Sequence, residues 1–136
     1  MKTNRLKIGE KANDSRIITE ADILDFARVS GDYNPIHVDK DKASKSIFGH
    51  QIAHGMLVAS SISAILGCKY PGEGTIYLEQ NLKFLKPVYI GDTCDSTVTV
   101  SEIINEEKGI YKLTTVVNNQ HGEIVVDGYA VIKYIG

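Results

Sequence analysis

The spacing of apolar residues predicts a helix in the first third of the chain. Between Thr19 and Gly31 the apolar positions recur at helical intervals, and Asp22 lies three residues after a residue that can cap a helix. Gly31 can adopt the left-handed conformation that commonly ends a helix. We therefore predict a helix over residues 20–30, followed by a turn.

A second helix is predicted from Gly55 to Leu66. This segment contains no charged residue, and small or apolar side chains occupy all of its faces. A helix without a polar stripe is typical of a buried helix, so we expect it to be covered nearly all round. Gly67 is expected to end it.

The second half of the chain has the pattern of β-strands. Its Val-, Ile-, Thr- and Tyr-rich runs alternate in part and predict strands at 75–84, 93–103, 110–118 and 124–135. Hairpin loops are expected at 105–109 and 119–122, and short extended pieces at 6–9 and 15–18. A buried helix followed by antiparallel strands predicts an α+β fold with the sheet wrapped around the helix. Such a sheet leaves free edges, so we expect a homodimer.

Length and composition narrow the class of protein. With 136 residues, we expect a single domain over residues 1–136. The net charge of −2 and the scattered lysines predict no nucleic-acid partner and no anionic membrane surface. No segment approaches a membrane span or a signal peptide, and Cys68 and Cys94 are isolated thiols. We therefore expect a cytoplasmic protein with reduced cysteines.

The candidate chemistry lies between the two predicted helices. Asp32 and His37 flank Pro35 on a turn, so their side chains can converge. Imidazole has a reference pKa of about 6.5 and suits proton transfer near neutrality. The first N–H groups of the second helix, at Gly55 and Met56, could stabilise negative charge on a carbonyl oxygen. The alternative is structural: Asp-x-Asn-Pro also makes turns, and a histidine between apolar neighbours often packs in a core.

A metal site is not expected. His50 and His54 have a spacing that zinc sites use, but no glutamate lies between them and no third ligand suggests itself. The segment also precedes the second helix instead of lying on it.

Two stretches resemble a known family. Residues 30–39, SGDYNPIHVD, together with Phe48-Gly49 and the run from Ile52 to Leu57, resemble the hydratase-2 motif. That motif belongs to the (R)-specific enoyl-CoA hydratases, the MaoC-like branch of the hot-dog fold. The resemblance extends from about residue 6 to residue 134, and it is more specific in the first half than in the strands.

The resemblance implies an activity, a fold and an assembly. The implied reaction is the reversible syn addition of water to trans-2-enoyl-CoA, giving (R)-3-hydroxyacyl-CoA, with short-chain substrates favoured. No cofactor is implied, because coenzyme A is part of the acyl-CoA substrate. The implied fold is a hot-dog domain, with the substrate in a tunnel at the interface of a homodimer.

The resemblance also implies roles for particular residues. Asp32 and His37 would be the catalytic acid–base pair acting on one water molecule, and Gly55 would supply the oxyanion donor. Residues implied to bind substrate or shape the site are Asn34, which would brace the turn, His54, which would shape the loop before Gly55, and Ser63, Leu66 and Val131, which would lie near the acyl pocket.

Two alternatives remain open. A hot-dog thioesterase usually places a carboxylate on or beside the central helix, whereas residues 55–66 contain no Asp or Glu. A non-catalytic module that binds acyl-CoA or acyl carrier protein would keep the fold without needing Asp32 and His37. Neither the acyl length nor the choice of carrier follows from these residues, nor does the order in which the pair exchanges protons.

Overall fold

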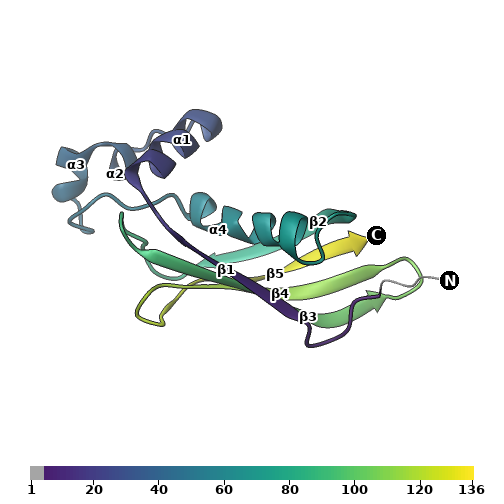
Figure 1. Cartoon of the computed structure of the whole chain (residues 1–136). Helices are drawn as coiled ribbons and strands as arrows, with labels where there is room; N and C mark the ends of the chain where they lie inside the picture. Colours follow the sequence, from purple (N-terminus) through teal and green to yellow (C-terminus); the bar gives the residue numbers. More distant parts are fainter. Residues whose placement is uncertain (1–4) are drawn as a thin grey trace.

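A five-stranded antiparallel sheet supports a layer of helices on one face (Figure 1). The computed structural model describes residues 5–136. The strands are β1 (Lys11–Ile17), β2 (Thr75–Phe84), β3 (Thr93–Asn105), β4 (Ile110–Asn118) and β5 (Ile124–Tyr134). Their order in the sheet is β1-β3-β4-β5-β2, so β2 forms an edge although it is second in the chain. The predicted α+β class is confirmed.

The helices are α1 (Glu20–Ser30), α2 (Pro35–Val38), α3 (Lys40–Ser44) and α4 (Gly55–Ala64), which continues as a π-helical turn, η1 (Ile65–Lys69). Helix α4 lies along the sheet, whereas α1, α2 and α3 gather beyond one end of it (Figure 1). No helix of the part of the chain from residue 5 onward is long and apolar enough to cross a membrane.

Helix α1 has the predicted bounds because its end signals are local. The Asp22 N–H donates to the Thr19 hydroxyl at 3.1 Å, and the Thr19 N–H donates to the Asp22 carboxylate at 3.0 Å. Gly31 has a φ of 81°, and its N–H donates to the carbonyl of Ala27 at 2.8 Å. The capping box and the left-handed stop together define both ends of the helix.

Helix α4 differs from its prediction in two respects. Its sheet-facing side, with Val58 and Ile62, is buried, but Met56 is 57% exposed and Ser63 is also exposed. The expectation of burial all round is wrong for the single chain, because the sheet covers only one side of the helix. Gly67 does not end the helix: it lacks a left-handed φ, and the Tyr70 N–H donates to the Ile65 carbonyl at 2.8 Å.

Strand β1 is longer and more polar than expected. It runs without a break from Lys11 to Ile17, while Ile8 and Gly9 form a turn instead of an extended piece. Strand β1 has few apolar residues, and pairing with β3 compensates for this. Ser15 and Asn13 donate side-chain hydrogen bonds to Asp95 at 3.0 and 3.2 Å. The other four strands and both hairpins lie where predicted, with end differences of no more than two residues.

The core lies between α4 and the inner face of the sheet. Alternate residues of β3 and β4 point inward and are buried: Cys94, Ser96, Val98, Val100, Tyr111, Leu113, Thr115 and Val117. The two buried serines that meet here satisfy one another, because the Ser61 and Ser96 hydroxyl oxygens lie 2.5 Å apart. This packing holds the first turn of α4 in a defined place beside the α1–α2 turn.

Candidate active site

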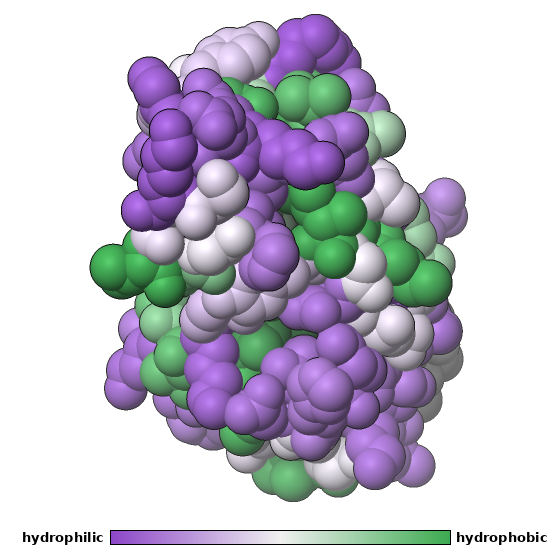
Figure 2. Space-filling model, turned by 90° about the vertical axis from the view of Figure 1, so that its left-hand side faces the viewer, coloured by the Kyte–Doolittle hydropathy of each residue, from purple (hydrophilic) through white to green (hydrophobic). Residues whose placement is uncertain are grey.

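A cleft of about 530 Å³ opens between the α1–α2 turn, the start of α4 and the chain segment after β2. Its walls are mainly apolar, and apolar surface is visible in the hollows on this side of the molecule (Figure 2). The lining residues include Phe26, Asp32, His37, Phe48, His54, Gly55, Phe84 and Val126. The cleft therefore combines a few polar groups with a largely apolar wall, as small-molecule sites do.

The turn that carries the acid is built by its own side chains. The Asn34 N–H donates to Asp32 Oδ1 at 3.1 Å, and the Ile36 N–H donates to the Asn34 side-chain oxygen at 3.3 Å. Pro35 occupies the first position of α2, where its missing N–H costs nothing. Asp32 Oδ2 has no hydrogen-bond partner within residues 5–136, and the exposed carboxylate faces the cleft.

His37 is held in one tautomer. The residue is 8% exposed, and Nδ1 lies 2.7 Å from the backbone oxygen of Ile52. A carbonyl oxygen only accepts hydrogen bonds, so Nδ1 carries the proton and Nε2 of the neutral ring keeps its lone pair. The 51–52 loop also secures the backbone of α2, because the Gln51 amide donates to the His37 carbonyl at 2.8 Å. His37 therefore has a basic nitrogen free for chemistry.

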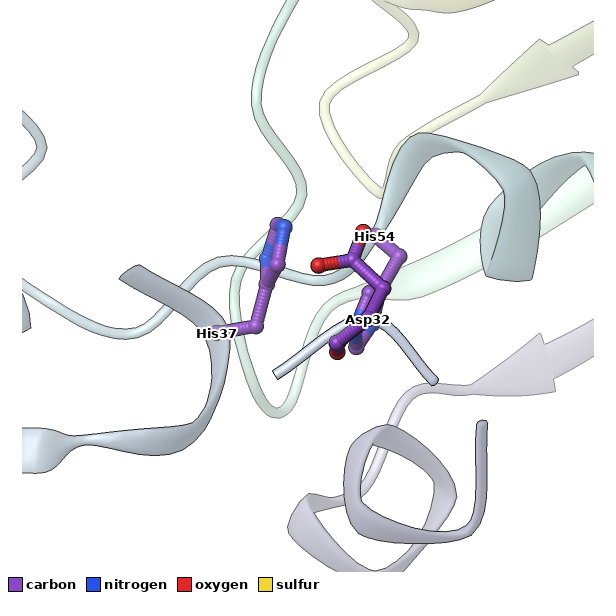
Figure 3. A group of neighbouring side chains, drawn as sticks. All are labelled: Asp32, His37 and His54. Carbon is purple, nitrogen blue, oxygen red and sulfur yellow. The ribbon is translucent and has the colours of Figure 1, made fainter. Parts of the chain in front are cut away.

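The Asp32 carboxylate and the His37 imidazole lie close together, and the His54 side chain lies beside them. The Asp32 carboxylate points towards the His37 ring, with His54 beside it (Figure 3). Potential ligand atoms of Asp32, His37 and His54 all lie within 4.8 Å of one another. The two imidazoles are stacked, with ring centroids 3.9 Å apart and planes inclined by 25°. Nitrogen lone pairs lie in the ring planes, so nearly parallel rings do not converge on one metal ion as a coordination site requires.

The start of α4 supplies unpaired donors. Neither the Gly55 N–H nor the Met56 N–H has a hydrogen-bond partner within the described residues, and no side chain caps the helix. Gly55 packs against Phe84 so closely that an added Cβ would lie 2.6 Å from the ring. A helix N-terminus with free N–H groups in an apolar cleft suits an oxygen on which negative charge develops.

Not every predicted site residue reaches this cleft. Asp32, His37, His54 and Gly55 line it, whereas Asn34, Ser63, Leu66 and Val131 do not. Ser63 is on the exposed side of α4, Leu66 is fully buried in the core, and Val131 lies between the inward-facing Ala130 and Ile132. Because side chains alternate along a strand, Val131 faces the outer side of the sheet. The substrate-binding roles of these four residues remain predictions.

Apolar walls of the cleft were missed by the sequence analysis. Phe26, Phe48, Phe84 and Val126 come from four segments separated along the chain. Only Phe26 had a local signal, since helical spacing places it on the inner side of α1. The others come together through the sheet and loop packing.

A helix lying along one antiparallel sheet is the arrangement of a hot-dog domain, and the candidate acid–base pair lies beside the start of that helix. Residues 3–121 match the model of the MaoC like domain. The chain belongs to the MaoC-like family.

Relatives of known activity cover nearly the whole chain. The (R)-specific enoyl-CoA hydratase of Aeromonas caviae is 41% identical over 98% of this chain and 98% of its own length. The enzyme of the same name from Rhodospirillum rubrum is 45% identical over 93% of this chain and 87% of its own length. The solved structure of the A. caviae (R)-hydratase involved in PHA biosynthesis superposes with a TM-score of 0.91, covering 95% of this chain and 97% of that one, at 42% identity. The predicted hot-dog fold is confirmed.

Proposed function

We propose that this chain is an (R)-specific enoyl-CoA hydratase, which also dehydrates (R)-3-hydroxyacyl-CoA in the reverse direction. The observation that carries the proposal is the meeting of a carboxylate and a tautomer-locked imidazole beside unpaired helix donors, inside an apolar cleft. The relatives that match nearly the whole chain carry the same activity in their names.

The mechanism follows from the chemistry of the thioester. Its carbonyl makes the β-carbon of a trans-2-enoyl group electrophilic. A water molecule held by Asp32 and His37 gives up a proton to the pair as its oxygen bonds to that carbon. The electron pair of the double bond moves towards the thioester oxygen, where the Gly55 N–H stabilises the charge. The proton then returns to the α-carbon on the same face, so that one water is added across the double bond.

The substrate is proposed to be a short-chain acyl-CoA, and no separate cofactor takes part. Aromatic rings of Phe26, Phe48 and Phe84 bound the cleft of about 530 Å³, which supports a short acyl group. Polyhydroxyalkanoate synthesis or short-chain acyl-CoA metabolism would supply the substrate or consume the product. The cytoplasm is the proposed compartment, supported by the two free thiols, Cys68 and Cys94.

A homodimer is the proposed assembly. Strand β2 has one unpaired edge and carries several exposed apolar side chains: Ile76, Tyr77, Leu78 and Phe84, with Leu85 just after it. The neighbouring side of α4, with Met56 and Ser63, is also uncovered. Pairing of β2 with the same strand of a second copy would extend the sheet and bury these residues. Ser63 would then lie at the interface.

Hydration of crotonyl-CoA tests the proposed activity directly. Loss of absorbance of the conjugated thioester measures turnover, and chiral analysis should identify an (R)-3-hydroxy product. We expect Asp32→Asn and His37→Ala each to lower turnover by at least about a hundredfold, because each removes a proton-transfer group. His121→Ala serves as the control, since this histidine is exposed in a hairpin loop.

The same assay separates the alternatives. A non-catalytic module would bind acyl-CoA without changing its absorbance, and a thioesterase would release free CoA thiol. Turnover that is unaffected by both substitutions would contradict the proposed function.

A further inference from the structure

We propose that His54 is a positioning residue, which holds the Asp32 carboxylate and the His37 imidazole at their working separation. The inference rests on the proposed hydratase function. It assigns to His54 a role beyond shaping the loop before Gly55. His54 is 2% exposed, so it offers little surface to a substrate.

The first contact joins His54 to the acid. His54 Nε2 lies 2.9 Å from the backbone oxygen of Asp32, which is 22 residues earlier in the chain. Because a carbonyl oxygen only accepts, Nε2 must carry the proton and donate it. This bond connects the residue before α4 directly to the α1–α2 turn. Gly55 is the next residue after His54. The bond therefore sets the position of the Asp32 backbone relative to the Gly55 N–H.

The second contact joins His54 to the imidazole. The rings of His37 and His54 stack at a centroid distance of 3.9 Å, while Phe26 packs against His54 at 4.8 Å with an inclination of 54°. The His37 ring is thus held at its Nδ1–H by the Ile52 carbonyl and on one face by His54. Rotation of His37 about its side-chain bonds would have to break one or both of these contacts.

Packing alone does not explain a histidine at this position. With the proton on Nε2, the lone pair of Nδ1 is buried, and it has no hydrogen-bond partner among the residues from 5 onward. An unpaired buried acceptor is unfavourable, and a phenyl ring would fill the same space without it. The feature that a phenyl ring lacks is the Nε2–H that holds Asp32. We infer that this donor is the reason for the histidine.

Two substitutions separate the two contacts. His54→Phe keeps a ring for stacking and loses the donor to Asp32, whereas His54→Gln keeps an amide donor and loses the ring. We expect each to lower kcat for crotonyl-CoA hydration by roughly tenfold to a hundredfold, with KM changed less than threefold, because misplacement of reacting groups affects the chemical step. The matched controls are His50→Phe and His50→Gln, which change an exposed histidine four residues earlier and should leave both constants unchanged.

The result that overturns the proposal is a His54→Phe enzyme with the kcat of the wild type. If Asp32→Asn and His37→Ala also had no effect, the proposed function would fail as well, so the two failures are distinguishable. Thermal unfolding of each variant establishes that it is folded. If His54→Phe does not fold, nitrogen NMR of the wild-type imidazoles provides the test: Nε2 of His54 should carry a proton, and an Nε2 without a proton would overturn the proposal.

Discussion

At the scale of single residues, Asp32 contributes to the turn and to the cleft at the same time. One carboxylate oxygen accepts the Asn34 N–H and stabilises the turn, and the other has no hydrogen-bond partner in the described chain. The carboxylate as a whole points towards the His37 ring (Figure 3). The structural and chemical interpretations of the Asp-x-Asn-Pro segment are therefore compatible. The turn presents the carboxylate in a fixed direction, which lowers the entropy lost when a water molecule is bound between acid and base.

Cys94 leads to a prediction about stability at high pH. Burial, with a smaller contribution from Asp92, raises the pKa of its thiol from 9.0 to about 11. The folded chain thus keeps the thiol protonated at a pH where the unfolded chain ionises. The resulting stabilisation is complete below pH 9 and is lost as the pH rises towards about 11. Between about pH 8 and pH 10 we expect the free energy of unfolding of the wild type to fall by about 1 kcal/mol more than that of Cys94→Val.

Urea unfolding of the two proteins at each pH measures this difference. The comparison with Cys94→Val removes the contribution of the tyrosines, whose ionisation affects both proteins equally. Equal losses of unfolding free energy in the two proteins would contradict a buried, protonated Cys94.

At the scale of elements, the start of α4 is the most constrained point of the site. In the proposed mechanism Gly55 supplies a free N–H to the cleft, and it also leaves room for the ring of Phe84. The core residues on the sheet-facing side of the helix, such as Val58 and Ile62, are buried. The position of the N–H donors is therefore set by the packing of the whole helix against the sheet.

A matched pair of glycine substitutions tests this constraint. Gly55→Ala places a Cβ 2.6 Å from Phe84, so that the ring or the helix start must move. We expect a loss of about 1–3 kcal/mol in stability and at least a tenfold loss of turnover. Gly67→Ala has no atom within 4 Å of its new Cβ and no positive φ, so it should be neutral or slightly stabilising and fully active.

Thermal unfolding and the crotonyl-CoA assay measure both variants of this pair. Equal behaviour of Gly55→Ala and Gly67→Ala would show that the contact between Gly55 and Phe84 does not limit the site.

At the scale of the whole molecule, the start of α4 and the end of β2 meet at the cleft, which Met56 and Phe84 both line. Both elements carry apolar residues that a single chain leaves in water, among them Met56 and Leu78. The cleft also has Phe84 in its wall, at the end of the same strand. A second copy paired along β2 would therefore close the substrate site as well as bury the exposed surface.

Leu78→Lys tests the proposed dimer. Leu78 is 52% exposed at an irregularity of β2, and a lysine there should oppose pairing of two β2 strands. We expect sedimentation to shift from dimer to monomer, with reduced turnover. Ile104→Lys is the control, because Ile104 is 46% exposed at a similar irregularity of β3, away from the β2 edge, and should leave the dimer intact. A wild-type protein that sediments as a monomer would contradict the proposal.

Features encoded within a few residues could be predicted from the sequence. The capping box of α1, the left-handed Gly31 and the Pro35 turn each depend on neighbours no more than four residues away. The strands β2 and β4 also have the predicted bounds, although only β4 is rich in β-branched residues. The proximity of Asp32 and His37 follows from the same short-range turn.

Contacts between distant segments could not be predicted from local patterns and are seen only in the folded chain. Strand β1 is continuous because it pairs with β3, about 80 residues later, and its own polar pattern does not indicate this partner. The one-sided burial of α4 depends on how much of the helix the sheet covers. The contacts of His54 with Asp32 and His37 likewise span 22 and 17 residues, so no local period could indicate them. The amino-acid order already indicates which chemical groups share a turn, because the interactions that form the turn are local. Their burial, tautomers and supporting contacts require the folded chain, because those depend on residues that meet only through folding.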